Sequence, residues 1–156
     1  MRKLSRPLLA LSICAAPLFA GALLVQIGDP AANPEAVAKH AVVVARITAC
    51  RSPEKTTLTA TAEGSVNGER RSIPLKVSAL STAGTFAIVR EWPDEGNWVV
   101  KLVATNPDYK NYAISVLVPF EGDRFTWAAI KHYFHAPTDA EVAAILDANH
   151  ITQISH

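Results

Sequence analysis

A predicted β-hairpin limits the choice of fold more than any other feature of the chain. Residues 56–66 (TTLTATAEGSV) alternate apolar and polar side chains, which is typical of a strand with one buried face. Asn67 and Gly68 follow, and both residue types tolerate the positive φ that a two-residue hairpin turn requires. Residues 70–80 (RRSIPLKVSAL) form the returning strand. Pro74 places this strand at a sheet edge or at a bulge, because proline has no amide donor.

Four further segments have the composition of strands and are joined by turn residues. They are AVVVARITAC (41–50), GTFAIVREW (84–92), WVVKLVAT (98–105) and YAISVLVPF (112–120). Strands that follow one another through short turns favour antiparallel sheets. We therefore expect a mainly β fold, an immunoglobulin-like antiparallel β-sandwich of six or seven strands over residues 40–120. Trp98 begins one of these strands and is expected to fill the core between the two sheets.

The C-terminal extension, residues 121–156, differs from the strands before it. Thr138 and Glu141 have the spacing of a capping box, and apolar residues then recur at helical intervals. This pattern predicts a short C-terminal α-helix over about residues 139–148, which Asn149 can end. Residues 124–136 fit either a short helix or another strand.

The N-terminus has the pattern of an export signal. Arg2, Lys3 and Arg6 precede an uncharged apolar run, and the small residues 20–22 (AGA) form a cleavage site. We expect residues 1–22 to be a signal peptide, so the rest is periplasmic or secreted. The alternative is an uncleaved anchor that extends to about residue 27, which would be the one contact with the membrane. Residues 28–39 contain two prolines and four alanines and are expected to be a linker.

Charge and composition argue against several classes of function. Of 15 basic and 14 acidic residues, three basic ones lie in residues 1–22, so the remainder has 12 basic and 14 acidic residues and a net charge of −2. This balance gives no basic patch for nucleic acid. The chain has no Gly-rich phosphate loop and no Ser nucleophile motif, so we expect no enzyme. Cys50 would be alone after Cys14 leaves with the signal, which excludes an internal disulfide.

Two histidines are candidate metal ligands. His132 and His135 are three residues apart, so they share a face on a helix and lie on opposite faces of a strand. One ion would need further ligands from Cys50, Asp139 or the two later histidines. Such ligands would favour Cu or Zn. The alternative function is therefore a periplasmic metal-binding accessory protein, whereas the main interpretation expects no cofactor.

The turns supply candidate contacts for a partner. We expect the loops at residues 52–56, 93–97 and 106–111 to form a contact surface at one end of the sandwich. The candidate contact residues are Trp92, Asp94, Asn97 and Tyr109. Trp127 is a second candidate, with Trp92, for an exposed aromatic ring that stacks on a ligand. The expected function is that of an exported, non-catalytic module that binds another envelope protein or a ligand through its loops.

Residues 83–105 (AGTFAIVREWPDEGNWVVKLVAT) resemble small exported immunoglobulin-like domains of the YtkA-like and copper-resistance CopC-like kind. The matching features are Gly84-Thr85-Phe86 and the turn from Pro93 to Trp98, and the resemblance spans roughly residues 40–120. It implies an immunoglobulin-like fold outside the cytoplasm. The sequence departs from the copper-binding members, because its one methionine is Met1 and no histidine follows closely after the cleavage site. The resemblance therefore extends to the fold and not to the copper ligands.

Overall fold

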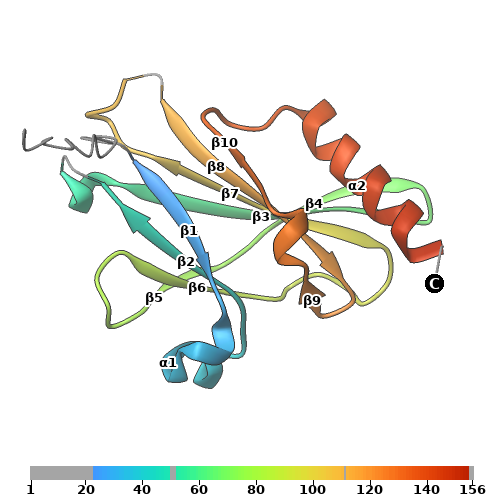
Figure 1. The fold of residues 1–156 in the computed structure, drawn as a ribbon, viewed down its shortest axis with the longest axis horizontal. Helices are drawn as coiled ribbons and strands as arrows, with labels where there is room; N and C mark the ends of the chain where they lie inside the picture. Colours follow the sequence, from blue (N-terminus) through green and yellow to red (C-terminus); the bar gives the residue numbers. More distant parts are fainter. Residues whose placement is uncertain (1–22, 50–51, 111, 155–156) are drawn as a thin grey trace, which may run out of the picture.

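The structure, a computed structural model, describes the backbone of residues 23–49, 52–110 and 112–154 and the side chains as far as residue 148. Two antiparallel sheets pack face to face in it (Figure 1). The first sheet, in spatial order, consists of β1 (Leu24–Gly28), β2 (Ala41–Thr48), β6 (Thr85–Val89) and β5 (Val77–Ala79). The second consists of β10 (Lys131–Tyr133), β8 (Ala113–Glu121), β7 (Asn97–Thr105), β3 (Thr57–Val66) and β4 (Glu69–Pro74), with β9 (Arg124–Phe125) also paired to β8.

The strand order confirms the expected immunoglobulin-like sandwich. β1, β2, β6 and β5 occupy the places of immunoglobulin strands A, B, E and D, and β8, β7 and β3 those of G, F and C. β4 adds a strand beside β3. The described residues contain ten strands, against the six or seven expected, because β1 precedes residue 40 and β9 and β10 follow residue 120.

The predicted hairpin is present between β3 and β4. Val66 pairs with Glu69, and the two turn residues between them have positive φ, 51° at Asn67 and 81° at Gly68. β4 forms the edge of its sheet, which confirms the placement inferred from Pro74. The alternation in β3 therefore fixes which of its side chains face the other sheet.

Trp98 fills the core between the sheets, as expected. Its side chain is 2% exposed, and its indole Nε1 donates a hydrogen bond of 2.8 Å to the Glu95 carbonyl oxygen. The ring lies against Gly64 of the neighbouring strand β3, where a side chain would collide with it. Glycine at this strand position therefore makes the space that the large ring occupies.

The C-terminal helix α2 (Asp139–Ile154) begins where the capping box predicts. The Thr138 amide donates to the Glu141 carboxylate at 2.8 Å, and the Glu141 amide donates to the Thr138 hydroxyl at 3.3 Å. Val142 and Leu146 pack on the outer face of the second sheet. The helix continues beyond the expected end at residue 148, to Ile154, so Asn149 does not end it.

The structure corrects the expected domain boundaries at both ends. β1 pairs with β2, and Leu23 and Val25 are buried in the core, so residues 23–27 are part of the sandwich. The expected linker contains η1 (Pro30–Ala32) and α1 (Pro34–Ala38), and the helix covers the outer face of the first sheet with Ala36. Residues 124–136 form β9, η3 (Trp127–Ala129) and β10. The predicted signal peptide, residues 1–22, and Cys50 lie outside the described residues.

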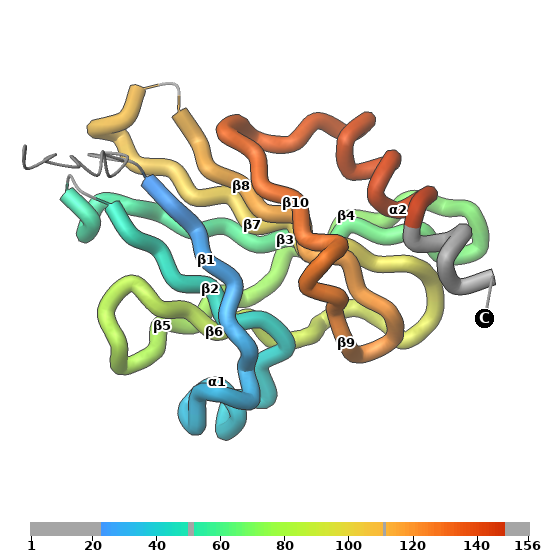
Figure 2. Tube along the Cα trace, viewed as in Figure 1, coloured from blue at the N-terminus to red at the C-terminus, as the bar shows by residue number. Residues whose placement is uncertain are grey.

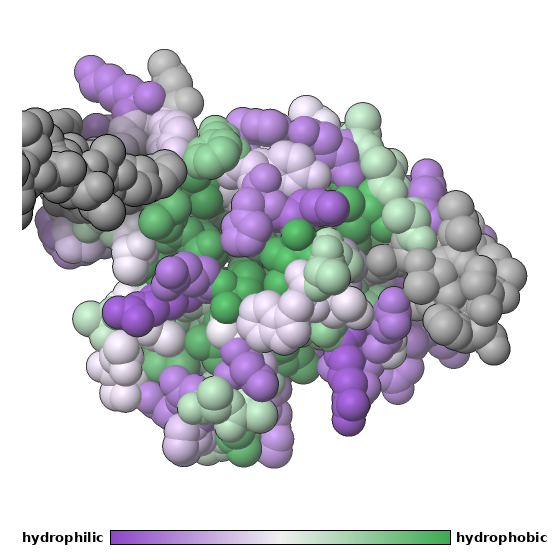
Figure 3. Space-filling view, viewed as in Figure 1, coloured by the Kyte–Doolittle hydropathy of each residue, from purple (hydrophilic) through white to green (hydrophobic). Residues whose placement is uncertain are grey.

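The two sheets leave one side of the sandwich open between their edge strands. On the face seen in Figure 3, hydrophobic residues gather between β1 and β10, with hydrophilic residues around them. Within the part of the chain that the structure describes, no helix is long and apolar enough to cross a bilayer. The fold therefore presents loops at its two ends and this open side as the places where a ligand can reach it.

Candidate functional site

The expected contact loops lie at opposite ends of the sandwich. Residues 93–97 precede β7 and residues 106–111 follow it, so the length of the strand separates them. Figure 2 shows the connection before β7 beside the β3–β4 hairpin, and the connection after β7 at the other end. The loop before β3, with η2 (Pro53–Lys55), lies beside the second of these, because Thr57 pairs with Thr105. The expectation of a single surface that unites all three loops is wrong.

Two of the four candidate contact residues are buried. Trp92 is 4% exposed, its ring meets the Phe120 ring edge-on at 5.0 Å, and the Arg90 guanidinium lies 5.5 Å from its centroid. Asn97 is 6% exposed at the start of β7. Neither can be a contact residue of the folded protein, and both are corrected to structural roles. Asp94 is exposed and pairs with Arg90 at 2.8 Å.

Tyr109 lies at the other end, where Asn106 joins two loops. The buried Asn106 amide donates to the Ser52 carbonyl oxygen and to the Thr56 hydroxyl, each at 2.9 Å, and its oxygen accepts from the Asp108 amide at 2.9 Å. One side chain thereby holds the turn after β7 against the turn before β3. Such a junction keeps the loops in one arrangement before any partner arrives.

Three aromatic rings form a row at this end. Tyr109 lies 6.4 Å from Tyr112, and Tyr112 lies 6.4 Å from Phe134, measured between ring centroids. Phe134 is 69% exposed, the most exposed of the large hydrophobic side chains that the structure describes. A shallow cavity of about 520 Å³ lies beside the row, and Lys110 and His135 contribute to its lining. We call the surface formed by Tyr109, Tyr112 and Phe134 the loop-end surface.

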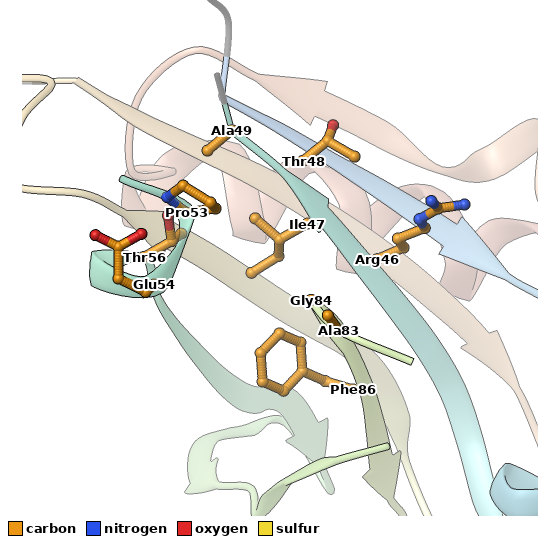
Figure 4. A pocket seen from close by; sticks show the side chains of 10 residues that line it. All are labelled: Arg46, Ile47, Thr48, Ala49, Pro53, Glu54, Thr56, Ala83, Gly84 and Phe86. Carbon is orange, nitrogen blue, oxygen red and sulfur yellow. The ribbon is translucent and has the colours of Figure 1, made fainter. Parts of the chain in front are cut away.

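A second cavity opens at the same end, between the end of β2, the beginning of β6 and the loop that precedes β3. It has a volume of about 430 Å³, and the Ile47 and Phe86 side chains point toward each other across it (Figure 4). Arg46 and Glu54 lie on its two sides and give it one charge of each sign. Thr56 lines this cavity and is bonded to Asn106, which lines the first one, so the two cavities are neighbours.

The two candidate metal ligands are not brought together. His132 lies in strand β10 opposite Val116, on the face that looks toward the first sheet. His135 follows the strand on the side of Tyr133, whose ring lies 5.5 Å away, and its Nε2 is 3.1 Å from both Glu141 oxygens. Among the described residues no group of three potential ligands converges. Strand β10 therefore separates the two imidazoles, with His132 on the side of the first sheet and His135 beside the start of α2.

The carboxylate of Glu141 serves the helix rather than a ligand. The Thr138 backbone N–H is the main cause that lowers the pKa of Glu141, and the hydrogen bond from His135 lowers it further. In addition, the Ser115 hydroxyl donates to the His135 carbonyl oxygen at 2.7 Å and ties this segment to β8. The segment that carries Phe134 is thus fixed on both sides, by β8 and by the start of α2.

A buried ion pair on the outer face of the second sheet was not expected from the sequence. Glu63 and Lys101 pair at 2.6 Å, and the hydroxyls of Thr61 and Ser72 each donate to the carboxylate at 3.1 Å. Burial alone would raise the pKa of Glu63, but the Lys101 ammonium and the two hydroxyls outweigh it, so the pKa is lowered. The lowered pKa keeps the carboxylate ionised, and three groups contact its Oε1, which indicates a structural role.

Comparisons with protein-family models, with curated proteins and with solved structures found no match. The resemblance to YtkA-like and CopC-like domains therefore stays a prediction. The loop-end surface combines two features that sequence reasoning missed, Phe134 and the junction at Asn106. The one signal in the sequence was the unusual density of aromatic residues in 109–112 and 133–134.

Proposed function

We propose that this chain is an exported, non-catalytic immunoglobulin-like module that binds another envelope protein through its loop-end surface. The observation that carries the proposal is the exposed Phe134 ring at the end of the row with Tyr112 and Tyr109, next to two cavities. A few residues contribute most of the binding free energy of typical protein interfaces, and tyrosine and tryptophan are enriched among them.

The loops around this surface support binding because they are held in place. Asn106 joins the two turns, and Lys55 and Asp108 approach each other at 3.3 Å across the same gap. The exposed ion pair adds little stability by itself, but it limits the loops to one geometry. A surface that is already ordered loses less conformational entropy when a partner binds.

Export is supported by where the fold begins. The cleavage pattern ends at residue 22, and among the described residues the buried core starts at Leu23, directly before β1. Cleavage after residue 22 would leave every described strand intact. N-terminal sequencing of the protein from the envelope fraction should give residue 23 as the first residue. A mature protein that begins at Met1 would contradict this part of the proposal.

Site-specific cross-linking tests the binding surface. A photoreactive phenylalanine analogue replaces Phe134 in one protein and Asp94 in a matched control, since Asp94 is also exposed but lies at the opposite end. Irradiation of envelope preparations should give one discrete covalent adduct to a protein from position 134 and none from position 94. Adducts from position 94 alone would place the partner at the opposite end of the sandwich. The absence of any adduct from position 134 would contradict binding at the loop-end surface.

A further inference from the structure

A series of aromatic rings leads from the core to the surface at the end opposite the loop-end surface. The Trp98 and Trp92 centroids are 6.4 Å apart, and Trp92 meets Phe120 at 5.0 Å. The series continues to Phe125 at 5.8 Å and from there to Trp127 at 5.0 Å. The first three rings are buried, whereas Trp127 is 54% exposed. The exposed indole is thus attached to the core through ring contacts that fix its position.

Trp127 forms one wall of a groove with a volume of about 570 Å³. The other side of the groove comes from η1, α1 and the beginning of β2, so it lies between the two sheets. Val37, Val42 and Phe125 give it an apolar lining. The volume falls within the range of about 300–1,000 Å³ that is usual for small-molecule sites.

Hydrogen-bonding groups stand at the rim of this groove. Among the described residues, neither the Asp123 carboxylate nor the Arg124 guanidinium has a hydrogen-bonding or ionic partner. Asp29 accepts one bond of 2.9 Å from the Ala31 amide, which leaves its second oxygen for a ligand. His40 adds an imidazole. The rim therefore offers donors and acceptors without a strong net charge, which does not favour a phosphate or a polycation.

An exposed aromatic face beside carboxylates and a guanidinium fits a sugar ring. The axial C–H groups of a pyranose form an apolar face that packs on an indole, and its hydroxyls form charge-assisted hydrogen bonds with ionised side chains. A β-1,4-linked chain of equatorial pyranoses presents such faces along its length, whereas an α-1,4-linked chain is coiled. We propose that the groove at Trp127 binds a neutral β-1,4-linked glycan, with one ring stacked on Trp127 and hydroxyls bonded to Asp123 and Arg124.

Isothermal titration calorimetry tests this inference on the full chain in a detergent without a sugar headgroup. The probes are hexasaccharides of β-1,4-linked glucose, β-1,4-linked N-acetylglucosamine and α-1,4-linked glucose. At least one β-linked probe should bind with a dissociation constant below about 1 mM, and Trp127→Ala should weaken that binding by about tenfold or more. Arg124→Ala should weaken it as well, and Trp127→Tyr should restore part of what Trp127→Ala loses, because it keeps an aromatic face.

Phe134→Ala is the matched control, because it removes an exposed aromatic ring at the other end of the sandwich. It should leave glycan binding unchanged, and circular dichroism should show all variants folded. Co-sedimentation with cellulose or with peptidoglycan then separates an external glucan from an envelope glycan as the source of the sugar. No binding of either β-linked probe, equal binding of the α-linked probe, or binding that survives Trp127→Ala would overturn the proposal. A protein captured through Trp127 in place of a glycan would overturn it too.

Discussion

Replacement of Gly64 by alanine probes the packing of the core most directly. A Cβ at this position would lie closer than 3.0 Å to three atoms of the Trp98 ring. β3 cannot move away, because it is hydrogen-bonded to β4 on one side and to β7 on the other. Overpacking of this kind lowers the free energy of unfolding by roughly 1–3 kcal/mol when the surroundings can adjust. Because β3 cannot adjust, we expect a loss of about 3 kcal/mol for Gly64→Ala. In a domain of this size that lowers the Tm by roughly 10 °C.

The effect of Gly64→Ala on the free energy of unfolding should have the opposite sign once the Trp98 ring is removed. In a Trp98→Leu background the alanine methyl has space, and glycine within a strand is about 0.5–1 kcal/mol less favourable than alanine. Gly64→Ala should therefore stabilise that variant, which gives a coupling free energy above roughly 3 kcal/mol between the two sites. Urea unfolding followed by far-ultraviolet circular dichroism measures all four proteins of this cycle.

Gly28→Ala is the control for a change of glycine to alanine within a strand. Its Cβ would meet only ordinary contacts, the nearest to Val44 at 3.5 Å, so this substitution should raise the free energy of unfolding by about 0.5–1 kcal/mol. If Gly64→Ala costs the same with and without the Trp98 ring, the ring does not fill the space beside Gly64. The account of how the two sheets pack would then be refuted.

Four further substitutions test other parts of the structure. Lys101→Met leaves the buried Glu63 carboxylate without its cation and should lower the free energy of unfolding by roughly 3 kcal/mol in urea titrations at pH 7. The folded pKa of Glu63 is below 4.5, so the ionised carboxylate stabilises the fold above pH 4.5. This stabilisation is lost as the pH falls through the lowered pKa. Glu63→Gln should therefore remove this part of the pH dependence of the free energy of unfolding. Gly68→Ala forces alanine to a φ of 81° and should cost about 1 kcal/mol by the same unfolding assay. Thr138→Ala removes the N-cap of α2 and should lower the free energy of unfolding by about 1 kcal/mol. Thermal scans should show this loss as a Tm that is lower by a few degrees.

Local sequence signals predicted those parts of the fold that local physics decides. Asn67 and Gly68 fixed the hairpin because few residue pairs accept two positive φ values in succession. Pro74 marked an edge because it cannot donate a hydrogen bond to a neighbouring strand. Thr138 and Glu141 located the start of α2 because their bonds are made within one turn. Each of these inferences needed no knowledge of distant residues.

Errors arose where distant segments decide the outcome. β1 follows directly on an apolar export-like run, and hydrophobicity cannot show where that run ends and a buried strand begins. The turn beside Trp92 predicts an exposed ring, but Phe120 of β8 packs against it. The separation of the contact loops is an exception, because the nine residues of β7 alone place the loops before and after it at opposite ends. The loop-end surface itself depends on Phe134, whose neighbour Tyr112 is 22 positions away in the sequence.

The position of β1 at the edge of the first sheet has a practical consequence for shortened versions of the protein. A fragment that starts at residue 40 would lack β1 together with the buried Leu23 and Val25, and β2, eight residues long, would become the new edge. A long apolar edge of this kind pairs readily with the same edge of another molecule. Such fragments should form dimers and aggregates as their concentration rises, so recombinant production should retain everything from residue 23 onward.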